Sequence, residues 1–196
     1  MILEFCFGKF LMKDICKWAK TEVEIKYHNE EWCRVCHDER KLFEMLILEG
    51  MQAGLTWKCI LNKRENMREA FDNFDYKKIA KYNSKKMEEL LNNKGIIRNR
   101  RKLEAMIINA NKFIEVQKEF GSFDKYIWSF TKGKRIDNKL KPTDDLPAKS
   151  ELSDLISKDL IKRGFKFTGS VIVYSYLQGI GIINDHSINC MFHDEK

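Results

Sequence analysis

Residues 42–57 read LFEMLILEGMQAGLTW, and the rest of the chain is organised around them. Leu42, Met45 and Leu46 recur at the i, i+3, i+4 spacing that predicts an amphipathic helix. The next position on the same apolar stripe is Glu49. Burying an unpaired charge costs several kcal/mol, so we expect Glu49 either to have partners or to bind something.

Two glycines and a tryptophan follow this carboxylate. We expect Gly50 and Gly54 to end the helix, after which Trp57 presents a large flat ring. An inward carboxylate beside an indole suits a flat ligand that carries hydrogen-bond donors or positive charge. The alternative is a buried Glu49 that forms a structural ion pair with one of the many Lys or Arg residues. This stretch alone leaves both interpretations open.

The composition of this 196-residue chain predicts an all-α protein. Hydrophobic residues make up 43% of the chain and charged residues 33%, with only 2 Pro and 10 Gly. This length suits one compact domain, or two closely fused helical lobes. The net charge of +7 favours a polyanionic partner, nucleic acid first and an anionic membrane surface second. Because no apolar run approaches the ~18 residues of a membrane span, we expect no membrane partner.

The ends and the cysteines suggest an intracellular protein. Residues 1–11 are apolar but lack a basic leader, so we expect an N-terminal extension rather than a signal peptide, followed by one helical domain over residues 12–196. The cysteines are irregularly spaced, which favours reduced thiols or metal ligands over disulfides. The run Cys33-Arg34-Val35-Cys36-His37 matches the attachment pattern of a c-type haem, although a surface loop that carries thiols is the simpler interpretation.

Helical patterns continue beyond the organising stretch. We expect helices over residues 58–71, 75–82 and 84–91, with Ser84 capping the last of these. The basic run at 98–102 opens another helix, and its side chains either contact phosphates or form a solvated face.

Two further segments have simpler compositions. Residues 120–130 are rich in aromatic side chains, which we expect to pack in the core. Residues 132–149 are polar and contain both prolines, which predicts a surface connection.

The C-terminal third predicts two helices joined by a short turn, at about residues 150–180. Ser150 or Ser153 is expected to cap the first helix, and Lys162, Arg163 and Gly164 end it. The inner stripe of that helix is Leu152, Leu155, Ile156 and Leu160.

The turn between these helices has features that suit DNA. Gly164 and Gly169 bound it, Lys166 adds charge, and an apolar helix follows from Ser170 to about Gly179. Amides at a helix N-terminus face phosphates well, and glycines let a backbone approach closely. This is the pattern of a helix–hairpin–helix, and an ordinary helical hairpin is the alternative.

Four side chains near the two ends offer a metal site. Cys16 and His28 lie near the N-terminus; His186 and Cys190 lie near the C-terminus, four residues apart, the spacing of one helical face. Cysteine and histidine are the ligands that zinc prefers. Taken together, the four predict a tetrahedral zinc site that ties the termini.

These features occur together in a known family, because the chain resembles DNA-3-methyladenine glycosylase I of the helix–hairpin–helix superfamily. The resemblance runs from Cys16 to Cys190. The blocks that carry it are YHNEEW at 27–32, KLFEM at 41–45, LEGMQAGLTW at 48–57, KREN at 63–66, GIIR at 95–98, KRGFKF at 162–167 and NDH at 184–186.

The resemblance implies roles for individual residues. Glu49 and Tyr27 match the catalytic pair that hydrogen-bonds the extruded base, and Trp57 matches the residue that stacks on it. Trp18 and Trp32 match aromatic residues that border the same pocket. Further matches are the structural zinc ligands Cys16, His28, His186 and Cys190, and Gly54 and Leu55 of the loop that enters the gap left in the duplex.

The resemblance also implies a function. The expected activity is that of a monofunctional DNA glycosylase, which flips out and excises 3-methyladenine from alkylated double-stranded DNA during base excision repair. We expect one structural zinc per chain, a monomer, and a cytoplasmic location of the bacterial type. A non-catalytic helix–hairpin–helix module that binds damaged DNA is the alternative from a different class.

One stretch departs from the family pattern. Where the family usually has a Trp-Gly-x-Pro turn, this chain has Trp32-Cys33-Arg34-Val35. Losing the Gly and the Pro together puts the conformation of this loop, and the position of Trp32, in question. Cys33 and Cys36 would also be weak competitors for zinc.

Overall fold

The computed structural model describes residues 15–194, and this part of the chain is mostly helical. The expected extension, residues 1–11, lies outside the described residues. The elements are α2 (Glu22–Glu30), α3 (Glu39–Gln52), α4 (Trp57–Ala70), the 3₁₀ turn η1 (Asp72–Phe74), α5 (Tyr76–Ile79), α6 (Ser84–Asn92), α7 (Arg100–Phe120), α8 (Phe123–Ser129), β1 (Ile136–Asp137), α9 (Glu151–Lys162), α10 (Ser170–Gly179) and β2 (Ile183–Asn184). The strands β1 and β2 form one short parallel pair. The all-α expectation is thus confirmed at the level of a mostly helical fold.

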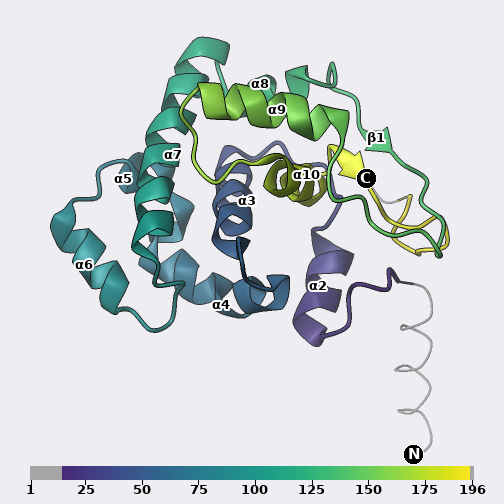
Figure 1. Ribbon diagram of the computed structural model, residues 1–196, viewed down its shortest axis with the longest axis horizontal. Coiled ribbons are helices and arrows are strands. Elements are labelled where there is room, and N and C mark those ends of the chain that lie inside the picture. Colours follow the sequence, from purple (N-terminus) through teal and green to yellow (C-terminus); the bar gives the residue numbers. More distant parts are fainter. Residues whose placement is uncertain (1–14, 195–196) are drawn as a thin grey trace, which may run out of the picture.

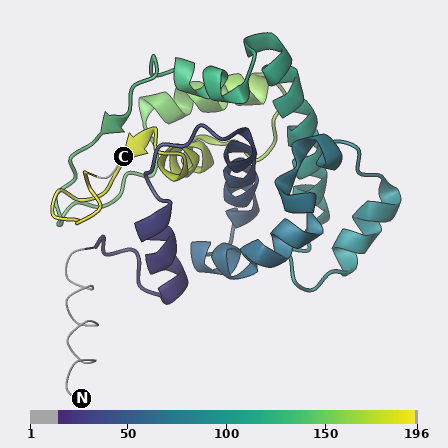
Figure 2. The same ribbon diagram turned by 180° about the vertical axis from the view of Figure 1, so that it is seen from behind.

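Helix α3 lies at the centre, with α4, α7, α8 and α10 packed around it (Figures 1 and 2). Every residue from Leu42 to Met51 is buried. The predicted end at Gly50 is wrong, because the helix continues to Gln52. Gly50 serves a different purpose: a Cβ atom there would lie 3.4 Å from the Cβ of Phe167, so the glycine lets the turn before α10 lie close against α3.

Short helices between α4 and α7 follow the prediction, with one difference in capping. Asn83, rather than Ser84, caps α6, since its side chain accepts a hydrogen bond from the Lys86 amide. The expected aromatic core of residues 120–130 is confirmed. Phe123 is fully buried and stacks on Phe113 of α7 at a centroid distance of 4.1 Å.

Helices α9 and α10 pack against each other as the predicted hairpin (Figure 1). Ser150 caps α9, and Ser153 hydrogen-bonds back to it. Leu155 is 55% exposed, so its predicted place on the inner stripe is wrong. After α9, Gly164 has a φ of +94° and the Phe165 amide donates to the Leu160 carbonyl, a C-terminal arrangement that favours glycine.

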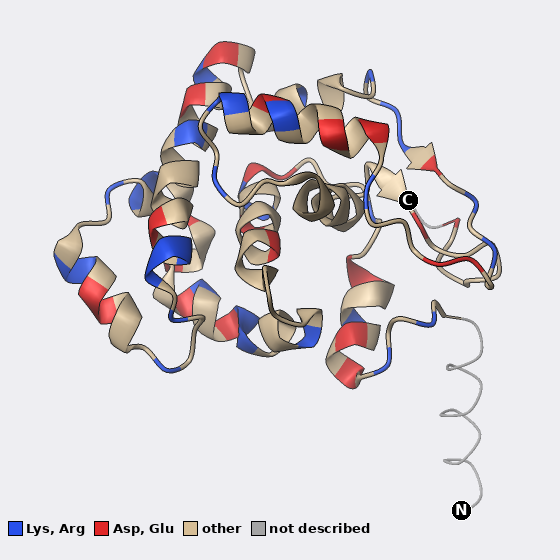
Figure 3. Cartoon of the chain, viewed as in Figure 1, with Lys and Arg blue, Asp and Glu red and all other residues tan. Residues whose placement is uncertain are grey.

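Charge and hydropathy are unevenly distributed. Lys and Arg are interspersed with Asp and Glu along most helices, whereas α10 carries no charged residue (Figure 3). The connection over residues 132–149 lies largely at the surface, as predicted, and contributes β1. Within residues 15–194, no helix is both long enough and apolar enough to cross a membrane.

Candidate active site and metal centre

Three helices bring the predicted base-binding residues together. Tyr27 comes from α2, Glu49 from the last turns of α3, and Trp57 is the first residue of α4. The rings of Tyr27 and Trp57 meet edge to face, with centroids 5.1 Å apart. The charge of Glu49 contributes to raising the pKa of Tyr27, after the larger effect of burial, so these two groups share one environment. Residues separated by up to thirty positions thus converge on one place.

Glu49 is buried without an ionic partner. Its side chain is 4% exposed, and its Oε2 atom has no hydrogen-bond partner among the described residues. Burial raises the pKa of its carboxyl from 4.5 to about 8. A carboxyl in this position is ready to accept a hydrogen bond or to face a positive charge.

Within residues 15–194, Glu49 forms no ion pair, and Arg64 and Arg68 bind another carboxylate. Glu44 accepts hydrogen bonds from the Nε atoms of Arg64 at 2.7 Å and of Arg68 at 2.8 Å. Arg64 also forms a two-pronged pair with Glu31, at 2.6 and 2.8 Å. This network joins α2, α3 and α4, the helices that carry Tyr27, Glu49 and Trp57.

A chain of aromatic rings extends from this site. Trp18 packs against Tyr27 with centroids 6.2 Å apart and against Trp32 at 4.9 Å. Trp32 in turn stacks on His28 at 5.6 Å. The indole Nε1 atoms of Trp18 and Trp57 are buried and have no hydrogen-bond partner in residues 15–194. Trp18 therefore lies beside Tyr27, whereas Trp32 lies one ring further away.

The four predicted metal ligands form one buried cluster. The donor atoms of Cys16, His28, His186 and Cys190 all lie within 4.8 Å of one another. The Sγ of Cys190 is 3.6 Å from Nε2 of His28 and 3.4 Å from Nδ1 of His186, and the Sγ of Cys16 is 3.6 Å from the same Nδ1. Ligand atoms around a tetrahedral zinc lie about 3.3–3.8 Å apart, given bonds of roughly 2.0–2.3 Å. The cluster therefore fits such an ion.

The second nitrogen of each histidine is also engaged. Nδ1 of His28 lies 2.7 Å from Oδ1 of Asn29, and Nε2 of His186 lies 3.1 Å from the carbonyl oxygen of Trp32. Such contacts hold the ring proton on the outer nitrogen, so that Nε2 of His28 and Nδ1 of His186 face the cysteine sulfurs with their lone pairs. Nε2 of His28 also accepts a hydrogen bond from the Cys16 amide at 3.3 Å. Asn29 directly follows His28 in the sequence, but no sequence pattern marked it as a partner of the histidine.

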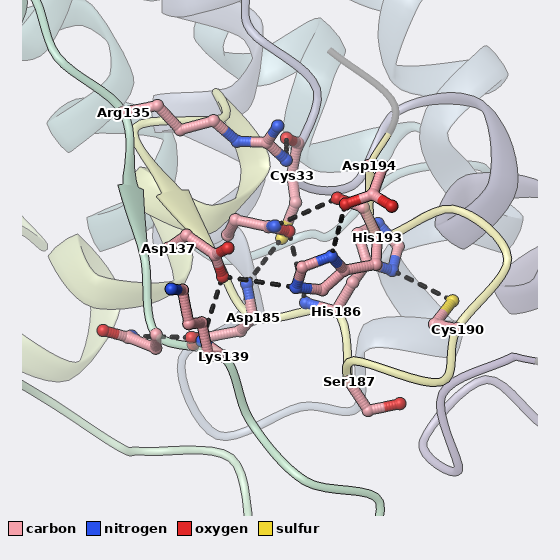
Figure 4. Close-up of polar contacts among 12 residues, drawn as sticks. Cys33, Arg135, Asp137, Lys139, Asp185, His186, Ser187, Cys190, His193 and Asp194 are labelled. Carbon is pink, nitrogen blue, oxygen red and sulfur yellow. Dashed lines mark hydrogen bonds and ion pairs between the residues drawn. The ribbon is translucent and has the colours of Figure 1, made fainter.

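His186 and Cys190 do not lie on a helix, so that part of the expectation is wrong. They lie in the turns that follow β2, where the Cys190 amide donates to the Ser187 carbonyl (Figure 4). Asp185, missed as a functional residue, anchors this segment. Its carboxylate accepts hydrogen bonds at 2.7 Å from Tyr174, Gln178 and Asn138. The spacing of four therefore reflects a compact turn held by Asp185.

The loop that departs from the family pattern is held by buried contacts. Cys33 has a φ of +60°, a conformation that suits glycine, and its side chain is fully buried. Its amide donates to the Gln178 carbonyl, its carbonyl accepts from Arg135, and its Sγ accepts from the Asp185 amide at 3.4 Å (Figure 4). This thiol is inaccessible to a haem, and the group of four candidate metal ligands does not include it.

The residues predicted to contact DNA lie at two exposed turns. Gly54 has a φ of +75°, and Leu55, which is 41% exposed, follows it in the turn between α3 and α4. Lys166 and Gly169 are exposed in the turn between α9 and α10, whose N-cap is Gly169. Lys102, from the basic run, is instead 8% exposed, and its Nζ donates to the carbonyls of Met51 and Ala53.

Comparisons with known proteins agree with this arrangement. A model of the family described as methyladenine glycosylase matches residues 17–194. A DNA-3-methyladenine glycosylase of Haemophilus influenzae is 42% identical over 176 residues, which cover 89% of this chain and 95% of that protein.

Solved structures give the same result. A crystal structure of 3-methyladenine DNA glycosylase I has a TM-score of 0.88 and 42% identity, covering 91% of this chain and 99% of the other. The Staphylococcus aureus 3-methyladenine DNA glycosylase I, solved to explain recognition of 3-methyladenine, has a TM-score of 0.89 and 32% identity, covering 95% and 99%. With sequence and fold matched over nearly its whole length, this chain belongs to the methyladenine glycosylase family.

Proposed function

We propose that this protein is a monofunctional DNA glycosylase that excises 3-methyladenine from alkylated double-stranded DNA. The observation that carries the proposal is the buried, unpaired carboxyl of Glu49 in the environment it shares with the facing rings of Tyr27 and Trp57. Relatives named for this activity support it. Inside DNA an adenine methylated at its minor-groove ring nitrogen is cationic, and its glycosidic bond is weak. The protein therefore has to extrude the base and hold it while the bond breaks.

Each of the three side chains suits such a base. A cation entering the site favours the ionised form of Glu49, which then accepts from the exocyclic amine in a charge-assisted hydrogen bond worth roughly 1.5–3 kcal/mol. Trp57 stacks on the ring and attracts it by about 0.5–2 kcal/mol. Tyr27 supplies a directional hydroxyl, while Trp18 and Trp32 border the pocket. Water then attacks the sugar and leaves an abasic site, without a lysine nucleophile.

Two exposed turns are proposed to contact the duplex. Leu55, presented by Gly54, enters the gap that the extruded base leaves. At the hairpin, Gly164 and Gly169 allow the backbone to approach, Lys166 adds a positive charge, and the N-terminal amides of α10 face a phosphate.

The metal cluster is proposed to hold one structural zinc. Cys16, His28, His186 and Cys190 would fill all positions of a tetrahedral ion, as in closed structural sites. The ion would supply cross-linking rather than chemistry. Through Trp32, which stacks on His28, it would also support the aromatic wall next to Trp18.

The test is release of free base from alkylated duplex DNA. The wild-type protein should release 3-methyladenine and leave alkali-labile abasic sites. Glu49→Gln, which keeps the shape but removes the charge, should lower the rate by roughly tenfold or more, given the strength of a charge-assisted hydrogen bond. Glu69→Gln, an exposed change on α4, is the matched control and should leave the rate unchanged.

Two outcomes would decide against the proposal. Binding to alkylated duplex without any released base would favour the alternative, a damage-binding module that leaves the glycosidic bond intact. Equal rates for wild type and Glu49→Gln would remove Glu49 from the reaction, and the site would have to be sought elsewhere.

A further inference from the structure

Helix α7 carries two buried polar side chains whose contacts lie outside the helix. Lys102 is 8% exposed and Asn109 is 3% exposed. They are seven residues apart, which places them on one face, two turns from each other. That face is turned toward α3 and the turn between α9 and α10.

Lys102 binds the end of α3. Its Nζ donates to the carbonyl of Met51 at 2.8 Å and to the carbonyl of Ala53 at 2.7 Å. A cation at a helix C-terminus satisfies carbonyls that lack partners within the helix. The next residues are Gly54 and Leu55, so the ammonium fixes the base of the exposed turn over residues 53–55, here called the insertion turn.

Asn109 binds the hairpin turn, residues 164–169. Its Nδ2 donates to the Lys166 carbonyl at 2.9 Å, and its Oδ1 accepts from the Lys166 amide at 2.8 Å. This reciprocal pair holds the backbone of one residue by both its donor and its acceptor, as a strand partner would. The side chain of Lys166 remains exposed.

The hairpin turn also packs directly on α3, the helix that leads into the insertion turn. Gly50 of α3 lies against Phe167 of the hairpin turn, where only 3.4 Å would separate an added Cβ from the Cβ of Phe167. Helices α3 and α7 pack side by side (Figures 1 and 2). The insertion turn and the hairpin turn are therefore held by one helix and have little freedom to move apart.

We propose that Lys102 and Asn109 are positioning residues, which make α7 a brace that sets the spacing between the insertion turn and the hairpin turn. The inference rests on the proposed function, because spacing matters only if both turns contact the same duplex. Two linked contacts strengthen binding only when their geometry lets both engage at once. Because α7 holds both turns in that geometry before DNA binds, the two turns lose little conformational entropy on binding.

The experiment separates duplex binding from base binding. Lys102→Met keeps the length of the side chain and removes the ammonium; Asn109→Leu keeps the shape and removes both hydrogen bonds. Affinity is measured for a duplex containing an abasic-site analogue, and separately for free 3-methyladenine. Each variant should bind the duplex about tenfold more weakly. This is the loss expected when the charge-assisted contact of Lys102, or the pair of hydrogen bonds of Asn109, is removed. Each should bind the free base as the wild type does.

Matched controls come from the same helix. Lys118→Met removes an equal charge from the exposed far end of α7, and Asn111→Leu changes an exposed asparagine that bonds to the Ile107 carbonyl. Neither should alter duplex affinity. If Lys118→Met weakens binding as much as Lys102→Met, net charge rather than positioning is responsible and the proposal is overturned.

The double variant tests whether the two residues share one task. If both residues act by setting one spacing, freeing either turn already prevents the two turns from contacting the duplex together. The duplex affinity of Lys102→Met combined with Asn109→Leu should then be little lower than that of the weaker-binding single variant. Losses that multiply would mean two independent local effects and would overturn the brace.

Hydrogen exchange keeps the proposal testable if a variant is unstable. Amides of the insertion turn should exchange faster in Lys102→Met, and the Lys166 amide faster in Asn109→Leu, while the core of α3 stays protected. Loss of protection throughout the protein, or a matching loss of free-base affinity, would indicate general damage and contradict positioning. Failure of the proposed function looks different, since the wild type itself would then release no base, and the brace would fall with it.

Discussion

Two carboxylates on one helix have opposite environments. Glu44 pairs with Arg64 and Arg68, whereas Glu49, little more than one turn later, forms no ion pair with any residue that the structure describes. The first is a structural ion pair that stabilises the contact of α3 with α4. The second costs folding free energy whenever it is ionised, and a positively charged ligand would relieve that cost.

The first prediction concerns stability as a function of pH. The carboxyl of Glu49 has a pKa of about 8 in the folded protein, against 4.5 in the unfolded chain. Between these values the folded state retains a proton that the unfolded state releases, so stability falls as pH rises from about 4.5 to 8. Urea unfolding should show the wild type losing, relative to Glu49→Gln, on the order of a few kcal/mol across this range. Parallel curves for the two proteins would contradict the assigned pKa.

A second prediction concerns activity. If the ionised Glu49 holds the cationic base, kcat/KM for excision should rise with pH toward the pKa of about 8 of the free enzyme. Glu49→Gln should lack this rise, so its deficit relative to the wild type should be largest at and above about pH 8. Rates measured on one alkylated duplex between pH 6 and 9 provide the check; a wild-type profile without slope would argue that the neutral acid is the working form.

At the scale of elements, the hairpin presents charge on a backbone that is already fixed. Gly164 ends α9, Asn109 holds the Lys166 backbone, and Gly169 opens α10 without a side-chain cap. The exposed lysine is thereby held next to uncapped helix amides. This arrangement suits one phosphate, independent of base sequence.

The third prediction follows from that contact. Lys166→Ala should weaken binding to damaged and undamaged duplex by similar factors and reduce the slope of log affinity against log salt by about one. Lys158→Ala, a change at an exposed lysine of α9 further from the turn, is the control and should change the slope less. Affinities titrated over a salt series decide the matter; a change confined to one DNA sequence would point to a base contact instead.

At the scale of the whole molecule, the four candidate metal ligands bring together the two ends of the described chain. Cys16 and His186 are 170 residues apart in sequence and 3.6 Å apart in space. A metal ion held by both segments restricts the unfolded chain as a cross-link would, and its binding free energy adds to stability. The proposed base-binding residues are not ligands of this ion, although Tyr27 precedes His28 in α2 and both Trp18 and Trp32 pack on the His28 ring. They would therefore sense loss of the ion through packing.

The fourth prediction tests this separation. Metal analysis should return about one zinc per chain, and a chelator should lower Tm by roughly 10 °C or more, as expected when several kcal/mol are lost from a protein of this size. Cys190→Ser should behave like the chelated protein, while Cys59→Ser, which alters a half-buried thiol outside the cluster, should not. Base selectivity should change far less than Tm; an unchanged Tm in Cys190→Ser would contradict a structural metal.

Local pattern predicted much of this protein. The helical composition, the stripe that leads to Glu49 and the turn between Gly164 and Gly169 depend on side-chain chemistry and spacing within a few residues. These features depend on contacts between residues one or two helical turns apart, so they can be predicted from the amino-acid sequence.

The pairing of residues that are distant in sequence depends on the tertiary structure. Arginines of α4 bind Glu44 instead of Glu49, Lys102 is buried against α3 instead of facing solvent, and Gly50 lies inside a helix because Phe167 packs on it. These choices depend on which of many similar charges and surfaces come within contact distance, and that is settled by packing between elements. The residue types of the site follow from the amino-acid sequence, whereas packing between elements leaves Glu49 without an ion pair within residues 15–194.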